Sequence, residues 1–227
     1  MATFQSSTSH AQRVLECTIS PSLVRRRDLP LIGGWPATLV SLAMLLTLML
    51  GLPAHASGPS HDGAHRWSGT AFVGQFDDSR FLEILALDGG DLRSSYMGGA
   101  VLGRYLGRGP DPVAWEAETQ LYHHWGLQSL WEANLAIAAR WTRFPWDRWL
   151  DTSVSFGQGV SLASQRPPLE DETRNLLHYM HFEIAVQVPG SERVSLAGRV
   201  HHRSGGFGVY GVKGGSNFLA LGIRYRF

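Results

Sequence analysis

The segment Val200–Gly206 reads VHHRSGG, and its His202 and Ser204 are the residues whose types and spacing best suit chemistry. In an extended strand, residues i and i+2 point to the same face, with Cα atoms about 6.5–7 Å apart. Side-chain rotation can then bring an imidazole nitrogen to a hydroxyl, which is how a histidine base activates a serine nucleophile. The spacing is compatible with nucleophilic catalysis, and equally with polar side chains where a strand leaves a sheet.

The segments around this pair alternate apolar and polar residues with a period of two, which is typical of β-strands. The alternation is clear in Val113–Trp125, Trp131–Trp141, Tyr179–Val188 and Asn217–Phe227. In the last of these, one face carries Leu219, Leu221, Ile223, Tyr225 and Phe227, and the opposite face carries Ala220, Gly222, Arg224 and Arg226.

The two faces of these strands favour a membrane barrel over a soluble sandwich. The polar faces carry charges of both signs, and we expect an interior ion-pair network from Glu116, Glu118, Glu132, Glu183, Arg140, Arg199, Arg224 and Arg226. The apolar faces end in aromatic residues, which is typical of the girdles at both membrane interfaces. The predicted girdle residues are Trp115, Trp125, Trp131, Trp141, Trp146, Trp149 and Tyr225.

The sequence therefore predicts an all-β fold, a closed eight-stranded antiparallel transmembrane β-barrel. Its predicted strands are Arg66–Phe76, Ser94–Leu106, Val113–Trp125, Leu130–Phe144, Asp151–Ser161, Asn175–Val188, Arg193–His202 and Asn217–Phe227. The longer connections, Asp77–Arg93, Ser164–Arg174 and Ser204–Ser216, are expected on the outer side of the membrane.

The N-terminal segment predicts export. Arg25–Arg27 precede the uncharged stretch Ala37–Leu52, and an A-x-A site follows at Ala54–Ala56. These are the parts of a secretory signal peptide, and the stretch is short for a membrane anchor of about 20 residues. We expect residues 1–56 to be a cleaved signal peptide and residues 57–227 to be the barrel domain.

Cleavage would also change the charge and the cysteine content. It would remove Cys17, the single cysteine, so that the exported domain has no disulfide. It would remove four of the 20 basic and two of the 19 acidic residues, which leaves a net charge of −1 and nothing that favours nucleic acid.

Strand parity places the candidate pair on the outside of the barrel. Val194, Leu196 and Val200 define the outward face of their strand, and His202 and Ser204 continue it. His201 and Arg203 then point inward beside Arg199, where Glu183 on the preceding strand could pair with them. The outward pair would therefore face lipid at the end of the apolar band.

The export signal, the small barrel, the outward His202-x-Ser204 and the terminal LGIRYRF together resemble the lipid A 3-O-deacylase family of outer-membrane barrels (acyloxyacyl hydrolase-like). The similarity is best over His178–Phe227 and covers the rest of residues 57–227 only as a strand pattern. The resemblance implies that Ser204 attacks an ester-linked acyl chain of lipid A, that His202 is its base, and that the site faces the outer leaflet. It implies no cofactor.

Two positions depart from that family's pattern. The family follows its serine with an asparagine, whereas Gly205 can offer only its backbone N–H to an oxyanion. The family orients its histidine with a glutamate from the last strand, whereas GGSNF offers Ser216 or Asn217. Parity puts Asn217 on the outward face with His202. An amide oxygen can accept from the imidazole but stabilises an imidazolium less than a carboxylate does.

The remaining polar clusters predict no further site. His123-His124 and His201-His202 each divide between two faces, so neither pair predicts a metal site. Asp77-Asp78 and Glu170–Glu172 are expected to be solvated loop acids, with divalent-cation binding near lipopolysaccharide headgroups as the alternative.

Three functions remain open from the sequence. The first is a lipid A esterase acting in the outer membrane, and the second is a catalytically silent barrel with a structural or lipopolysaccharide-binding role. The third is a soluble periplasmic barrel that carries a lipid inside. The predicted partner is lipid A or lipopolysaccharide in a membrane, and formation of a homodimer is left open.

Overall fold

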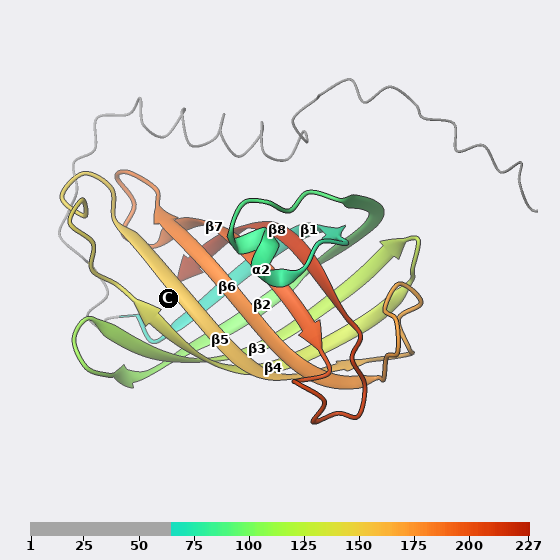
Figure 1. Ribbon diagram of the computed structural model, residues 1–227. Coiled ribbons are helices and arrows are strands. Elements are labelled where there is room, and N and C mark those ends of the chain that lie inside the picture. The colour runs from blue at the N-terminus through green and yellow to red at the C-terminus, as the bar shows by residue number, and fades with distance from the viewer. Residues whose placement is uncertain (1–64) are drawn as a thin grey trace, which may run out of the picture.

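A computed structural model describes residues 65–227, and the predicted signal peptide with Cys17 lies outside the described residues. The chain forms a closed barrel of eight strands, each antiparallel to its neighbours, in the order of the sequence (Figure 1). The strands are β1 (Trp67–Asp77), β2 (Leu92–Arg108), β3 (Val113–Gly126), β4 (Leu130–Trp141), β5 (Thr152–Ala163), β6 (Leu176–Gln187), β7 (Val194–Ser204) and β8 (Gly215–Arg226). The predicted fold class is confirmed, and β1 pairs with β8 to close the barrel without a free edge.

The strand limits differ from the predicted ones mainly in β2 and β4. β2 runs for 17 residues, and its weak alternation has a local cause at Gly99, which faces the interior. A Cβ there would lie 2.5 Å from the Tyr122 ring, so this position leaves the interior space to a side chain of β3. β4 ends at Trp141 instead of Phe144, just before a connection that contains Pro145, a residue that cannot donate to a strand ladder.

The barrel interior holds an apolar cluster and a charged network. The apolar cluster consists of Phe72, Phe76, Met97, Val101, Tyr122, Ala185, Ala197, Phe218 and Ala220. In the network, Glu183 binds Arg140 and Arg199, while Glu116 binds Arg140 and Arg224. This network confirms the predicted interior ion pairs, and it fills part of the interior with charged side chains, whereas a soluble lipid carrier would need an apolar lining.

Two predicted interior pairings are wrong. His201 and Arg203 do point inward, but Glu183 binds Arg199, directly opposite it in the β6–β7 register. His201 Nε2 instead lies 2.9 Å from Glu132 of β4, and Arg203 binds Glu170. Both partners come from across the barrel or from a connection, which adjacent-strand parity does not reveal.

The outer surface of the barrel is apolar, and aromatic side chains lie near both of its ends. Leu102, Leu121, Leu135, Ile137 and Ile223 are exposed on the strands. Trp125 and Trp131 lie near one end of the barrel, and Trp115, Trp141 and Tyr225 lie near the other, as in the aromatic girdles of membrane barrels. Trp146 and Trp149 are also exposed but belong to the β4–β5 connection.

Among residues 65–227, no helix has the length and apolar composition needed to cross a membrane.

A short helix was not predicted from the sequence. It is α2 (Phe81–Leu85), in the connection between β1 and β2. It lies against the outside of the barrel wall beside β7 and β8 (Figure 1). The β5–β6 and β7–β8 connections extend from the same end of the barrel, opposite the end that carries Phe227 (Figure 1).

Candidate functional site

The last two strands bring His202 and Asn217 together. These residues are direct partners in the register between β7 and β8, and Ser204 is opposite Gly215 two residues farther along. Direct partners in an antiparallel pair point to the same face, so His202, Ser204 and Asn217 all face outward, as predicted. His202 and Ser204 are half-buried, and Asn217 is buried.

A hydrogen bond of 2.6 Å joins His202 Nδ1 and Asn217 Oδ1. The orientation of the amide is fixed by its other end, because Asn217 Nδ2 donates to the Ser79 carbonyl over 2.7 Å. An amide oxygen only accepts, so the His202 proton lies on Nδ1 and Nε2 has a free lone pair. This tautomer is the one that a general base requires.

Ser204 lies beside this base but is turned toward the following connection. Its Oγ accepts a hydrogen bond of 3.4 Å from the Gly206 N–H. Transfer of the serine proton to His202 Nε2 therefore requires rotation of the Ser204 side chain, a local adjustment of the kind that substrate binding produces in catalytic pairs.

The backbone N–H of Gly205, predicted as an oxyanion donor, is already engaged. It donates to the Gly214 carbonyl over 3.1 Å across the base of the β7–β8 connection. The family's asparagine would not fit at this position, because a Cβ on Gly205 would lie 1.8 Å from the Val212 carbonyl oxygen. The glycine is thus a consequence of how tightly this connection folds.

The β1–β2 connection contributes residues that the sequence did not reveal. The Phe81 ring packs on the His202 imidazole, with ring centroids 4.8 Å apart. Ser79 holds the Asn217 amide, and its own N–H donates to Asp77 Oδ1 over 2.8 Å. No sequence signal links these residues to His202, since more than 100 positions separate them.

A second histidine lies next to the serine. His178 on β6 is the direct register partner of Ser204 and shares its outward face. Parity in β6 could have placed it outward, but its alignment with Ser204 depends on the register of two strands. Ser204 therefore lies between His178 on the neighbouring strand and His202 on its own.

Two of the acids expected in solvent are buried. Asp77 is 1% exposed, and Glu170 is 6% exposed. Glu170 accepts hydrogen bonds from Arg203 of β7 and Ser216 of β8. These bonds hold the β5–β6 connection against the inward-facing side of β7 and β8. Asp78 is exposed as expected and binds Arg93. The interpretation of Asp77 and Glu170 as solvated acids is wrong, because both are enclosed by folded connections.

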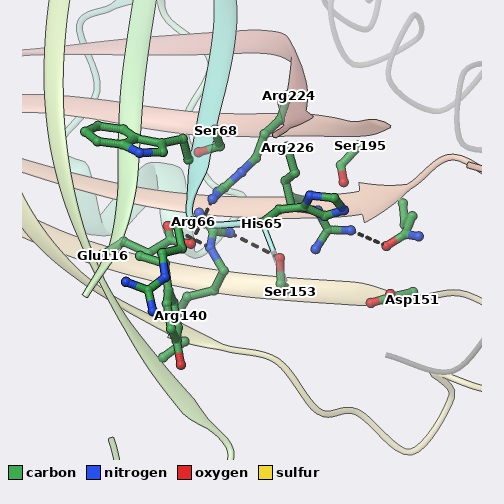
Figure 2. Close-up of a pocket in the computed structure, with 15 residues that line it drawn as sticks. His65, Arg66, Ser68, Glu116, Arg140, Asp151, Ser153, Ser195, Arg224 and Arg226 are labelled. Atoms are coloured by element: carbon green, nitrogen blue, oxygen red, sulfur yellow. Dashed lines mark hydrogen bonds and ion pairs between the residues drawn. The ribbon is translucent and has the colours of Figure 1, made fainter. Parts of the chain in front are cut away.

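The barrel also contains a small cavity far from His202. It lies where β1 begins and β8 ends, and its volume is about 40 Å³. Figure 2 shows the charged groups that line it, which include Glu116, Arg140, Arg224 and Arg226. Burial raises the pKa of the Asp151 carboxyl at its edge, and nearby Arg226 opposes that shift. The cavity is large enough for little more than water.

No group of three or more His, Cys, Asp or Glu side chains within residues 65–227 is arranged to hold a metal ion.

No protein-family model and no curated protein sequence matches the chain. Among solved structures it is similar to the outer membrane enzyme PagL, with 11% identity and a TM-score of 0.51 over 70% of this chain and 99% of that one. Neisserial surface protein A is 13% identical, with a TM-score of 0.42 over 71% and 97%. The N-terminal β-barrel domain of Pseudomonas aeruginosa OprF is 12% identical, with a TM-score of 0.39 over 72% and 98%.

At these identities the likeness to PagL establishes the fold and nothing finer. The chain is a closed eight-stranded antiparallel barrel of the kind found in bacterial outer-membrane proteins.

Proposed function

We propose that the protein is an outer-membrane serine esterase that removes an ester-linked acyl chain from lipid A. Ser204 is the nucleophile, His202 is its base and Asn217 orients the base. The observation that carries the proposal is the hydrogen bond of His202 Nδ1 to Asn217 Oδ1, which leaves Nε2 available beside an outward-facing serine.

The location of the three residues suits a substrate that resides in a membrane. They lie on the outer wall, at the end of the barrel that carries the three long connections, and apolar residues of β7 and β8 continue the same face. An acyl chain lying along that wall would present its ester near Ser204. This placement supports lipid A in the outer leaflet as the substrate.

The reaction needs only the protein and water. His202 Nε2 takes the proton of Ser204 as Oγ bonds to the ester carbonyl carbon, and the carbonyl oxygen becomes an oxyanion. The oxyanion collapses, the bond between the acyl carbonyl carbon and the sugar oxygen breaks, and this departing oxygen takes the proton from His202. Water, deprotonated by His202, then bonds to the carbonyl carbon of the acyl-serine. The bond from that carbon to Ser204 Oγ breaks, Oγ takes the proton back from His202, and the acyl chain leaves as a fatty acid.

The oxyanion requires N–H donors close to Ser204 Oγ. The Gly206 N–H already points at that oxygen, and the Gly205 N–H can join it by leaving the Gly214 carbonyl. We assign the developing charge to these two backbone groups.

Mass spectrometry of lipid A from Gram-negative cells tests the proposal. Cells that express the wild type should lose one ester-linked acyl chain, and cells that express Ser204→Ala should not. Ser94→Ala is the matched control, because Ser94 is an exposed serine at the same end of the barrel. Heat-modifiable migration verifies that each variant is folded.

A catalytically silent barrel is the competing function. It is favoured by Asn217, which stabilises an imidazolium less than the family's glutamate would. Unchanged lipid A in cells that contain folded wild-type protein would establish this second function and reject the esterase.

A further inference from the structure

We infer that Asp77 is a positioning residue of the same site: from β1, it supplies the negative charge that Asn217 lacks. The inference rests on the proposed esterase function. It explains how a histidine that has an amide in place of a carboxylate beside it can still act as a base.

Three strands place Asp77, Asn217 and His202 in one row. Asp77 is the register partner of Asn217 between β1 and β8, and Asn217 is the register partner of His202 between β8 and β7. All three face outward. Neighbouring strands are about 4.8 Å apart, so the carboxylate lies about 10 Å from the imidazole, with the amide between them.

Asp77 is buried without being fully satisfied. It is 1% exposed, and Oδ1 accepts from the Ser79 N–H, but Oδ2 has no hydrogen-bond partner within the described residues. A buried carboxylate with an unused oxygen costs free energy, and such groups in folded proteins call for an explanation. An electrostatic task provides one, because a charge shielded from water acts over a longer distance.

The same connection links Asp77 to the Asn217 amide. Asp77 fixes the Ser79 N–H, and the Ser79 carbonyl accepts from Asn217 Nδ2. The negative charge therefore lies at the far side of the amide whose oxygen meets His202. It favours the imidazolium that forms when His202 takes the serine proton.

The other charged or titratable groups packed around His202 are less suited to this task. On α2 and its N-cap, Glu83 and Arg80 are exposed, so water screens both. His178 on β6 carries no negative charge, and the outward residues of β8 beside His202, Asn217 and Leu219, are uncharged. On β7 itself, His201 points to the interior.

Asp77→Asn removes the negative charge but keeps the hydrogen bond, because the amide retains an Oδ1 that can accept from the Ser79 N–H. We expect kcat on purified lipid A in detergent micelles to fall about tenfold, from the loss of one buried charge at this distance. The matched control is Asp78→Asn, which removes the same charge from an exposed neighbour and should leave kcat unchanged.

Two further measurements test whether the effect is electrostatic. The thermal midpoint of Asp77→Asn should rise, since an incompletely satisfied buried charge is removed. Relocation of the charge in the double variant Asp77→Asn/Asn217→Glu should restore at least the wild-type kcat.

Each failure has its own signature. A wild type without esterase activity would reject the proposed function, and this inference with it. An active wild type with equal rates for Asp77→Asn and Asp78→Asn would overturn the inference alone. A loss of rate that comes with a lower thermal midpoint, or that charge relocation does not restore, would make Asp77 a structural residue and also overturn it.

Discussion

His202 Nδ1 and Asn217 Oδ1 lie 2.6 Å apart across two neighbouring strands that precede and follow a ten-residue connection. The contact fixes both the tautomer and the plane of the imidazole. Phe81 covers the ring from outside the barrel, so the ring is held by β7, β8 and the β1–β2 connection together.

Asn217→Ala is expected to lower kcat by about 100-fold or more, because the imidazole loses the acceptor that holds its tautomer. The measurement is release of fatty acid from purified lipid A. Asn175→Ala is the control, since Asn175 also bonds a backbone carbonyl, that of Ala163, at the same end of the barrel. An equal decrease of kcat in Asn217→Ala and Asn175→Ala would show that Asn217 has only a structural role.

Glu183→Gln is expected to destabilise the barrel by about 3–5 kcal/mol, because the buried Arg140 and Arg199 each lose one of their two carboxylate partners. Glu183 is fully buried and accepts from Arg140 over 2.8 Å and from Arg199 Nε over 2.9 Å. Urea unfolding in detergent, followed by gel migration of unheated samples, measures the change.

The control for Glu183→Gln is Asp111→Asn, which breaks the ion pair with Arg143 at the barrel surface. Both of these side chains are 64% exposed, so a loss of about 0–1 kcal/mol is expected. A similar change for the two variants would contradict the assignment of stability to the interior network.

Leu135→Arg tests whether the outer wall lies in lipid. Leu135 is in the middle of β4 and faces outward, so an arginine there should cost about 2–4 kcal/mol in a bilayer. Leu127→Arg is a matched control, because Leu127 is equally exposed but lies in the β3–β4 turn. Folding yield into lipid vesicles should fall only for Leu135→Arg, and equal yields would contradict a membrane-spanning wall.

Strand content and strand faces could be predicted because they are local properties. In β3, each inward glutamate is flanked by outward residues, so the period of two is visible in the sequence itself. β2 alternates less clearly because Gly99 leaves space for Tyr122, a residue of another strand. The helix α2 is only five residues long and has no pattern of its own to reveal it.

The candidate site was predictable only in part, because some of its features are local to a strand and others depend on distant segments. The outward parity of His202, Ser204 and Asn217 follows from the alternation in β7 and β8. The occupation of the Gly205 N–H by Gly214, and the burial of Asp77, depend on how connections fold.

The sequence by itself determined the strands, which of their faces is apolar, and the three residues that could form a catalytic group. These features repeat every two residues, so a short stretch contains the information. Only the tertiary structure decided that Ser79, Phe81 and Asp77 meet the histidine, because closure of β1 onto β8 brings together segments that the chain itself keeps far apart. It also decided which buried charges pair with each other. A buried charge needs an opposite charge in contact with it to offset its desolvation, and in a closed barrel that partner can come from a strand on the opposite side.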